Sequence, residues 1–364
     1  MVLLLTLLVG CWPNDADRAS LDFTQLPYDN EYLTDATATV TFFDTDLPCP
    51  TGEGTRFAAV YPDASDGPAP VAIVLHSGAF DYLIEGSLDG AHYYNPPRLD
   101  RGWAVSKVWE TLGLSLDEID ASEENLGTLP AALAEAGFVQ LYPANCWGDL
   151  WHNEQGVQDN DYEQESFSRN GRTIAGWMTQ LVTDEAFASD RGFSVPVELD
   201  PSQIFLIGLG EGGRGVTELL LRGQTPDIAG VLLDSVPDDL APYVDPLTTF
   251  SDIEVGLERI YGAKNLANIS DWSMRALIEG GAALPPRVGL VWSDGDPRLP
   301  LDTIAPTADA ISQLPGAWVS NQRSTGHIFL NADPELAAAA VSYLLTGDIS
   351  ADEADTDETD DTGQ

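Results

Sequence analysis

Short hydrophobic runs alternate with amphipathic stretches along most of the chain. Eight of these runs are rich in β-branched and aromatic residues and are bounded by turn-forming residues, which is typical of strands. Several contain almost no polar position, as expected for strands that are covered on both faces of a sheet. The predicted strands cover residues 36–44, 56–62, 70–76, 138–144, 203–208, 228–234, 287–293 and 316–321.

Amphipathic stretches with a helical period separate most of these strands. The last of them follows Asp333, whose carboxylate is a candidate N-cap. Strands that alternate with helices favour a mainly parallel sheet with helices on both faces, and the leading strand pair suggests an antiparallel start. We therefore expect an α/β fold with an eight-stranded sheet. The predicted helices cover residues 125–137, 173–187, 213–222, 301–313 and 334–345.

One domain, residues 36–348, contains all of these elements. Within it, residues 79–124 and 237–286 do not fit a minimal α/β unit. Insertions at such places lie over the carboxyl edge of the sheet, where ligands bind, so both are candidate lids. The segment after the domain, residues 349–364, is acidic and of low complexity, and we expect it to be disordered.

The amino terminus has the pattern of a targeting segment. Residues 2–10 form an apolar run that is too short to span a bilayer as a mature helix and about right for the hydrophobic region of a signal peptide, which we predict over residues 1–10. The run ends in Leu-Val-Gly-Cys11, which resembles the bacterial lipobox, although no Lys or Arg precedes it. The resemblance implies lipidation of Cys11, a polar tether over residues 11–35, and a lipid-anchored protein of the bacterial envelope, in the outer membrane or periplasm. The alternatives are a plain signal for secretion and a buried strand.

The charge of the chain excludes some partners. The formal net charge is -43, and only two lysines are present. The last fourteen residues contribute seven acids and no base, so most of the acidity is spread over the rest of the chain. Nucleic acid and anionic membrane surfaces are therefore poor partners on electrostatic grounds. The acidity fits either tolerance of high salt or a solubility bias of the source proteome.

Two cysteines remain if Cys11 is lipidated. Cys49 and Cys146 are an even pair in an oxidising compartment, and a disulfide between them is one interpretation. Two buried free thiols are the other, because the sequence does not give their separation in space.

A glycine-rich turn follows the predicted strand 203–208, in the order Gly-Leu-Gly-Glu-Gly-Gly from Gly208. The turn resembles the G-x-S-x-G motif of the α/β-hydrolase superfamily, nearest to its secreted esterases, polyester depolymerases and S9 peptidases. The resemblance covers roughly residues 37–347. It places the nucleophile position on Gly210, the acid on Asp296 after a strand, and the histidine on His327 after the next strand, which is the order of this superfamily.

The resemblance also implies an oxyanion loop and a substrate mouth. Backbone N–H groups after the third strand would cooperate with the N–H of Glu211 to hold a carbonyl oxygen. An aromatic-rich loop after the fourth strand would form the mouth. The residues concerned are Ser77, Gly78 and Ala79 in the oxyanion loop, and Trp147, Trp151 and His152 at the mouth.

Gly210 offers no hydroxyl for a histidine to deprotonate, so the triad chemistry lacks its nucleophile. A single base change, in the gene or in its sequencing, would convert a serine codon into this glycine. The leading hypothesis is a serine-less esterase-like or peptidase-like protein that binds an acyl, ester or peptide ligand. The first alternative is an active hydrolase that uses Ser77, Glu211 or water activated by His327, and Ser235, near a strand end, is a weaker substitute nucleophile. The second is a cell-surface interaction lipoprotein.

No cofactor or metal is expected. The four histidines lack the spacing of zinc ligands. A nucleotide-binding glycine loop belongs after the first strand of its unit, whereas Gly208 to Gly213 come late in the chain.

Overall fold

The computed structural model describes residues 32–35, 38–48, 54–62, 67–75, 128–143, 167–210, 212–221, 227–239, 273–296, 299 and 301–348. Among these residues, the helices are too short or too polar to cross a bilayer.

Both faces of a central sheet are buried by apolar side chains. Strands β4 (Ala69–Leu75), β5 (Val139–Pro143) and β7 (Gly230–Asp234) are buried along almost their whole length.

The described strands form one sheet in the order β1-β2-β3-β5-β4-β6-β7-β8-β9. The pairs β1–β2, β2–β3 and β3–β5 are antiparallel. The remaining pairs, from β5–β4 to β8–β9, are parallel. The α/β fold class and all eight predicted strands are confirmed, and β1 is an additional edge strand in the stretch predicted as a tether. The bounds are β1 Tyr32–Asp35, β2 Ala38–Pro48, β3 Gly54–Pro62, β4 Ala69–Leu75, β5 Val139–Pro143, β6 Leu199–Leu209, β7 Gly230–Asp234, β8 Val288–Trp292 and β9 Trp318–Asn321.

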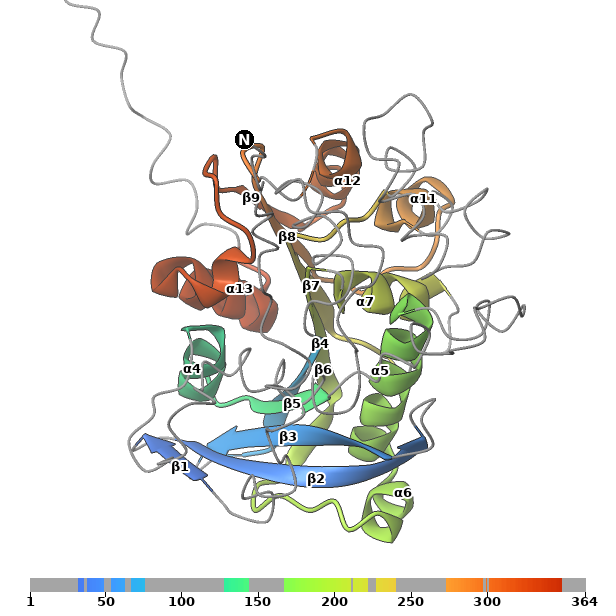
Figure 1. Cartoon of the computed structure of the whole chain (residues 1–364), viewed down its shortest axis with the longest axis vertical. Coiled ribbons are helices and arrows are strands. Elements are labelled where there is room, and N and C mark those ends of the chain that lie inside the picture. Colours follow the sequence, from blue (N-terminus) through green and yellow to red (C-terminus); the bar gives the residue numbers. More distant parts are fainter. Residues whose placement is uncertain are drawn as a thin grey trace, which may run out of the picture.

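Helices cover both faces of the sheet (Figure 1). One face carries α4 and α13, which pack against each other, and the other carries α5, α7 and α12. The bounds are α4 Thr128–Glu135, α5 Phe167–Thr183, α6 Glu185–Asp190, α7 Gly212–Leu221, α11 Met274–Glu279, α12 Leu301–Ser312, the 3₁₀ turn η4 Phe329–Asn331, and α13 Pro334–Thr346.

Capping side chains set two helix boundaries. The carboxylate of Asp333 accepts hydrogen bonds from the N–H groups of Glu335 and Leu336, which confirms the predicted cap of α13. The helix predicted over residues 173–187 is two helices, because α5 ends and the carboxylate of Asp184 begins α6 by accepting the N–H of Phe187.

The register of the parallel strands aligns their carboxyl ends. Leu209 at the end of β6 lies opposite Asp234 at the end of β7, and Asp234 lies opposite Val291 near the end of β8. Trp292 of β8 in turn lies opposite Asn321, the last residue of β9. The loops that follow β6, β7, β8 and β9 therefore leave the sheet side by side, and these loops carry the predicted site.

Several predictions concern residues outside the described ranges and stay predictions. They are the signal peptide, the lipidation of Cys11, the Cys49–Cys146 pair, the tail 349–364 and the insertion 79–124. Most of the tether also lies there. The described parts of the second insertion are residues 237–239 and 273–286, which include α11.

Candidate functional site

The turn between β6 and α7 is tight and is built on glycine. Gly210 has a φ of 51°, in the left-handed region that glycine adopts without steric cost. Its N–H donates to the carbonyl of Asp234 at 2.8 Å, and its own carbonyl accepts from the N–H of Gly213 at 3.1 Å. The residue at the predicted nucleophile position is thus held at the carboxyl end of β6, next to β7.

The neighbouring glycines let the turn close. A Cβ on Gly208 would lie 2.3 Å from the Cα of Gly213, and a Cβ on Gly213 would lie 2.2 Å from Cγ2 of Val236. Neither position has room for a side chain, so the glycine pattern of the sequence is explained by the close approach of β6, α7 and the loop after β7.

The side chains of Asp296 and His327 are in contact. Asp296 lies in the loop after β8 and His327 in the loop after β9. Nδ1 of His327 lies 2.7 Å from Oδ2 of Asp296, and the two side chains are 7% and 0% exposed. A carboxylate that accepts a hydrogen bond from Nδ1 orients the imidazole, so that Nε2 points away from the carboxylate. In a triad, Nε2 is the atom that exchanges protons.

Ser293 joins the acid loop to the histidine loop. Its hydroxyl donates to the carbonyl of Ser324 at 2.6 Å and accepts the N–H groups of Ser324 and Gly295 at 2.9 and 3.1 Å. The backbones are so close here that a Cβ on Gly295 would lie 2.6 Å from the carbonyl oxygen of Ser324. The contact between Asp296 and His327 is therefore supported by the loops that carry them.

A second acidic residue, Asp234, also contacts the histidine loop. It is the last residue of β7, is fully buried, and accepts the N–H of Leu330 on Oδ2 at 2.8 Å. The hydroxyl of Ser235 donates to Oδ1 of Asp234 at 2.9 Å and accepts the N–H of Ile328 at 2.9 Å. Two consecutive side chains at the end of β7 thus hold the backbone that directly follows His327.

Burial raises the pKa of Asp234 from its ordinary value of 3.8 to about 6. The N–H of Leu330, the hydroxyl of Ser235, the charge of His327 and the N–H of Phe329 act in the opposite direction and limit the rise. This carboxyl group therefore titrates between mildly acidic and neutral pH, at the edge of the candidate site.

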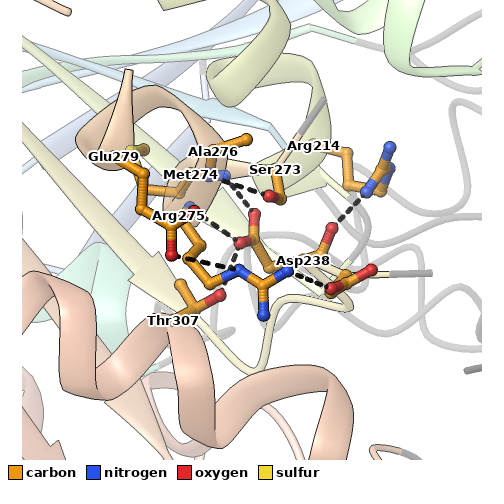
Figure 2. A network of polar contacts seen from close by, with 9 residues as sticks. Arg214, Asp238, Ser273, Met274, Arg275, Ala276, Glu279 and Thr307 are labelled. Atoms are coloured by element: carbon orange, nitrogen blue, oxygen red, sulfur yellow. Dashed lines mark hydrogen bonds and ion pairs between the residues drawn. The ribbon is translucent and has the colours of Figure 1, made fainter. Parts of the chain in front are cut away.

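A polar network fixes the loop that continues from Ser235 (Figure 2). The carboxylate of Asp238 accepts the N–H groups of Met274 and Arg275 at 2.7 and 3.3 Å, and the hydroxyl of Thr307 at 2.6 Å. Arg275 also forms an ion pair with Asp239 at 2.8 Å. The loop after β7 is thereby tied to α11 and α12.

The same loop is tied to α7, the helix that follows the glycine turn. The guanidinium of Arg214 is fully buried and donates to the backbone carbonyls of Pro237 and Asp238, at 3.3 and 2.6 Å. Figure 2 shows Arg214 beside the Asp238 network. The loop after β7 is therefore anchored to α7 as well as to α11 and α12.

The hydroxyl of Ser235 is an unsuitable substitute for the missing nucleophile. It is buried, it donates to the Asp234 carboxylate, and it accepts a backbone N–H. A nucleophile must instead give its proton to the histidine and reach the substrate. Asp234 and Ser293 are supporting residues that were not predicted from the sequence, and Ser235 was considered there only as a weak substitute nucleophile. The only available sign was that each lies at or just after the end of a predicted strand.

The remaining predicted site residues lie outside the described ranges, and their roles stay predictions. They are Ser77, Gly78, Ala79, Glu211, Trp147, Trp151 and His152. Among the residues that are described, no group of three or more His, Cys, Asp or Glu side chains is arranged to hold a metal ion.

The strand order, with a glycine turn after β6, an acid after β8 and a histidine after β9, defines the class: the protein has the α/β-hydrolase fold. A mutant of the esterase rPPE complexed with (S)-Ac-CPA is similar, with a TM-score of 0.50 and 13% identity, over 90% of this chain and 87% of that chain.

Two further solved structures are similar at lower scores. A thermostable esterase from Pseudomonas putida ECU1011 has a TM-score of 0.48 and 12% identity, over 92% of this chain and 85% of that one. An S-formylglutathione hydrolase from Agrobacterium tumefaciens has a TM-score of 0.48 and 16% identity, over 86% and 98% of the two chains. No protein-family model and no curated protein matches the chain.

Proposed function

We propose that this protein is a serine-less α/β-hydrolase-fold protein that binds an acyl, ester or peptide ligand without forming a covalent intermediate. One observation carries the proposal. The Asp296–His327 pair is assembled at 2.7 Å, and the loop of His327 and the turn at Gly210, which has no side chain, both bond to Asp234. The polar half of a triad is present, and the hydroxyl that an acyl-enzyme requires is absent at this position.

The retained pair suits ligand recognition. With Asp296 accepting from Nδ1, the neutral imidazole of His327 would accept a hydrogen bond at Nε2, and the protonated imidazole would donate one. A carbonyl or ester oxygen is an acceptor, and a peptide N–H is a donor, so the site would bind either class according to its protonation state. The geometry supports a polar anchor at the carboxyl edge of the sheet.

A second candidate function is slow hydrolysis by activated water. It is favoured by the same pair, because an imidazole oriented by a carboxylate is a general base. As a water oxygen bonds to the acyl carbon, Nε2 of His327 would take the proton from the water. The imidazolium would then return that proton to the leaving oxygen as its bond to the acyl carbon breaks, which leaves a carboxylic acid and an alcohol. Without a positioned nucleophile, the rate would be far below that of a complete triad.

The interaction-protein alternative receives no support from the described surface. Among the described residues, Leu301 is the one large hydrophobic side chain that is strongly exposed, at 51%. A docking surface for a protein partner would present a contiguous apolar patch.

The first prediction concerns restoration of the missing hydroxyl. We expect Gly210→Ser to hydrolyse short-chain p-nitrophenyl esters on the order of 10³-fold faster than the natural chain, because His327 then has a proton to accept. A fluorophosphonate should label Gly210→Ser at the new serine and leave the natural protein unlabelled at that position. Both assays would use the purified chain from Trp12, in low and in molar salt.

Gly210→Ala is the matched control, because it adds a Cβ at the left-handed position without a hydroxyl. It should stay inactive, and His327→Ala should abolish the gain in the Gly210→Ser background. Turnover by the natural chain that depends on His327 would instead establish the hydrolase alternative. If Gly210→Ser folds but gains neither activity nor labelling, the turn is not a nucleophile position and the proposal is wrong.

A further inference from the structure

The described residues contain three non-glycine positions with a positive φ, and all three lie in the loops of the candidate site. Ser235 has a φ of 53° in the loop after β7. Arg323 and Ile328 have φ values of 48° and 57° in the loop after β9, which carries His327. A β-branched residue such as Ile328 rarely adopts this conformation, so the surrounding contacts must hold it there.

Ser235 supplies one of these contacts directly. Its Oγ accepts the N–H of Ile328 at 2.9 Å, so two left-handed residues from different loops are joined by one hydrogen bond. The same Oγ donates to Asp234, whose other carboxylate oxygen accepts the N–H of Leu330. The backbone after His327 is therefore held at two successive points, by a buried hydroxyl and a buried carboxylate.

Asp234 also contacts the glycine turn, through its main chain. The backbone carbonyl of Asp234 accepts the N–H of Gly210 at 2.8 Å. The side chain of Asp234 contacts the histidine loop while its main chain contacts the turn. Asp234 thus bonds to both parts of the candidate site.

We propose that Asp234 and Ser235 are positioning residues for His327. They hold the next residue, Ile328, in the left-handed region and keep the histidine loop at a fixed place relative to the Gly210 turn. Asp296 orients the imidazole ring through Nδ1, while Asp234 and Ser235 place the backbone that carries it. The inference rests on the proposed function in that His327 is taken as the residue that meets the ligand.

The second prediction tests this positioning on the full natural chain without any ligand. Diethyl pyrocarbonate acylates accessible neutral imidazoles, and the rate at His327 can be followed by mass spectrometry of its peptide. We expect Ser235→Gly to raise this rate on the order of fivefold, as expected for loss of one restraining hydrogen bond. Glycine adopts a φ of 53° without strain, so the variant removes the hydroxyl and keeps the backbone conformation.

Asp234→Ala should raise the modification rate of His327 similarly. Asp234→Asn should keep it near the natural rate, because an amide still accepts the N–H of Leu330 and donates to Ser235.

Thr179→Val is the matched control. It removes another buried hydroxyl hydrogen bond, from Thr179 to the carbonyl of Ala175 in α5, away from the histidine loop. His76, His92 and His152 serve as internal references in the same sample.

Unchanged modification of His327 in folded Ser235→Gly would overturn the proposal, as would an equal increase in Thr179→Val, since that would indicate general loosening. Ser235→Gly keeps the experiment decisive if Asp234→Ala does not fold. The result does not depend on catalysis or ligand binding. Failure of the Gly210→Ser experiment and failure of this one can therefore be told apart.

Discussion

At the scale of single residues, Asp234 combines full burial with a charge. Its carboxylate accepts hydrogen bonds from the N–H of Leu330 and the hydroxyl of Ser235, yet burial still raises its pKa to about 6. A carboxyl group whose pKa is higher in the folded than in the unfolded state holds its proton more tightly when folded. Its contribution to stability is therefore greatest in acid and is lost as the pH rises.

The third prediction follows from the sign of this shift. Between about pH 4 and pH 6 the folded state binds more protons at Asp234 than the unfolded state, so this group lowers the free energy of unfolding as the pH rises. Over this range the contribution of Asp234 to the free energy of unfolding falls by about 3 kcal/mol. In Asp234→Asn this term is absent, so the stability of the variant relative to the natural protein should increase from pH 4 to 7. Urea unfolding at several pH values measures it, and a difference independent of pH would contradict the raised pKa.

At the scale of secondary-structure elements, the loop after β7 connects three helices. Asp238 accepts hydrogen bonds from the start of α11 and from Thr307 in α12, while its carbonyl accepts from Arg214 in α7 (Figure 2). Burial raises the pKa of Asp238, and the N–H of Met274, the hydroxyl of Thr307 and the charge of Arg214 oppose the rise. The helices around the site therefore share one buried anchor.

The fourth prediction concerns that anchor. Asp238→Ala leaves two backbone N–H groups and one hydroxyl without their acceptor, and we expect a loss of about 3 kcal/mol or more in the free energy of unfolding. Asp309→Ala, at an exposed position of α12, should change stability by no more than about 0.5 kcal/mol. Denaturant unfolding of the two variants gives the comparison. Equal stability of the two would show that the network contributes nothing.

At the scale of the whole molecule, the formal charge of -43 acts against the compact state. Like charges on a folded surface repel, and the repulsion is screened within about 10 Å at 0.1 M salt. Only seven of the acidic residues lie in residues 351–364. The repulsion therefore belongs mainly to the folded domain, which makes stability a function of ionic strength.

The fifth prediction is that the melting temperature rises with sodium chloride, most steeply below about 0.5 M, where screening changes most. Each kcal/mol of repulsion that is removed should raise the melting temperature by about 2–4 °C. A chain that ends at residue 350 should keep most of this response. A melting temperature that does not change with salt would show that charge repulsion does not limit the stability of the domain. A response that disappears with the tail would place the relevant charges in residues 351–364. Calorimetry over a salt series provides the measurement.

Much of the architecture could be predicted from hydrophobic periodicity. The eight strands and the start of α13 at Asp333 followed from the sequence, because strands buried on both faces require apolar runs and a helix start requires a capping side chain. The break between α5 and α6 was missed, since Asp184 caps a helix within a stretch of continuous helical period.

The sequence by itself determined the order of the candidate site: a glycine turn at Gly210, then Asp296, then His327, each after a strand, which is the order in which this fold presents its nucleophile position, acid and histidine. Only the tertiary structure decided which atoms meet. The roles of Asp234, Ser235 and Ser293 depend on hydrogen bonds between loops that are up to 96 residues apart in the chain. Such contacts carry no periodic signal, because they arise when the parallel strands align their carboxyl ends and bring separate loops together.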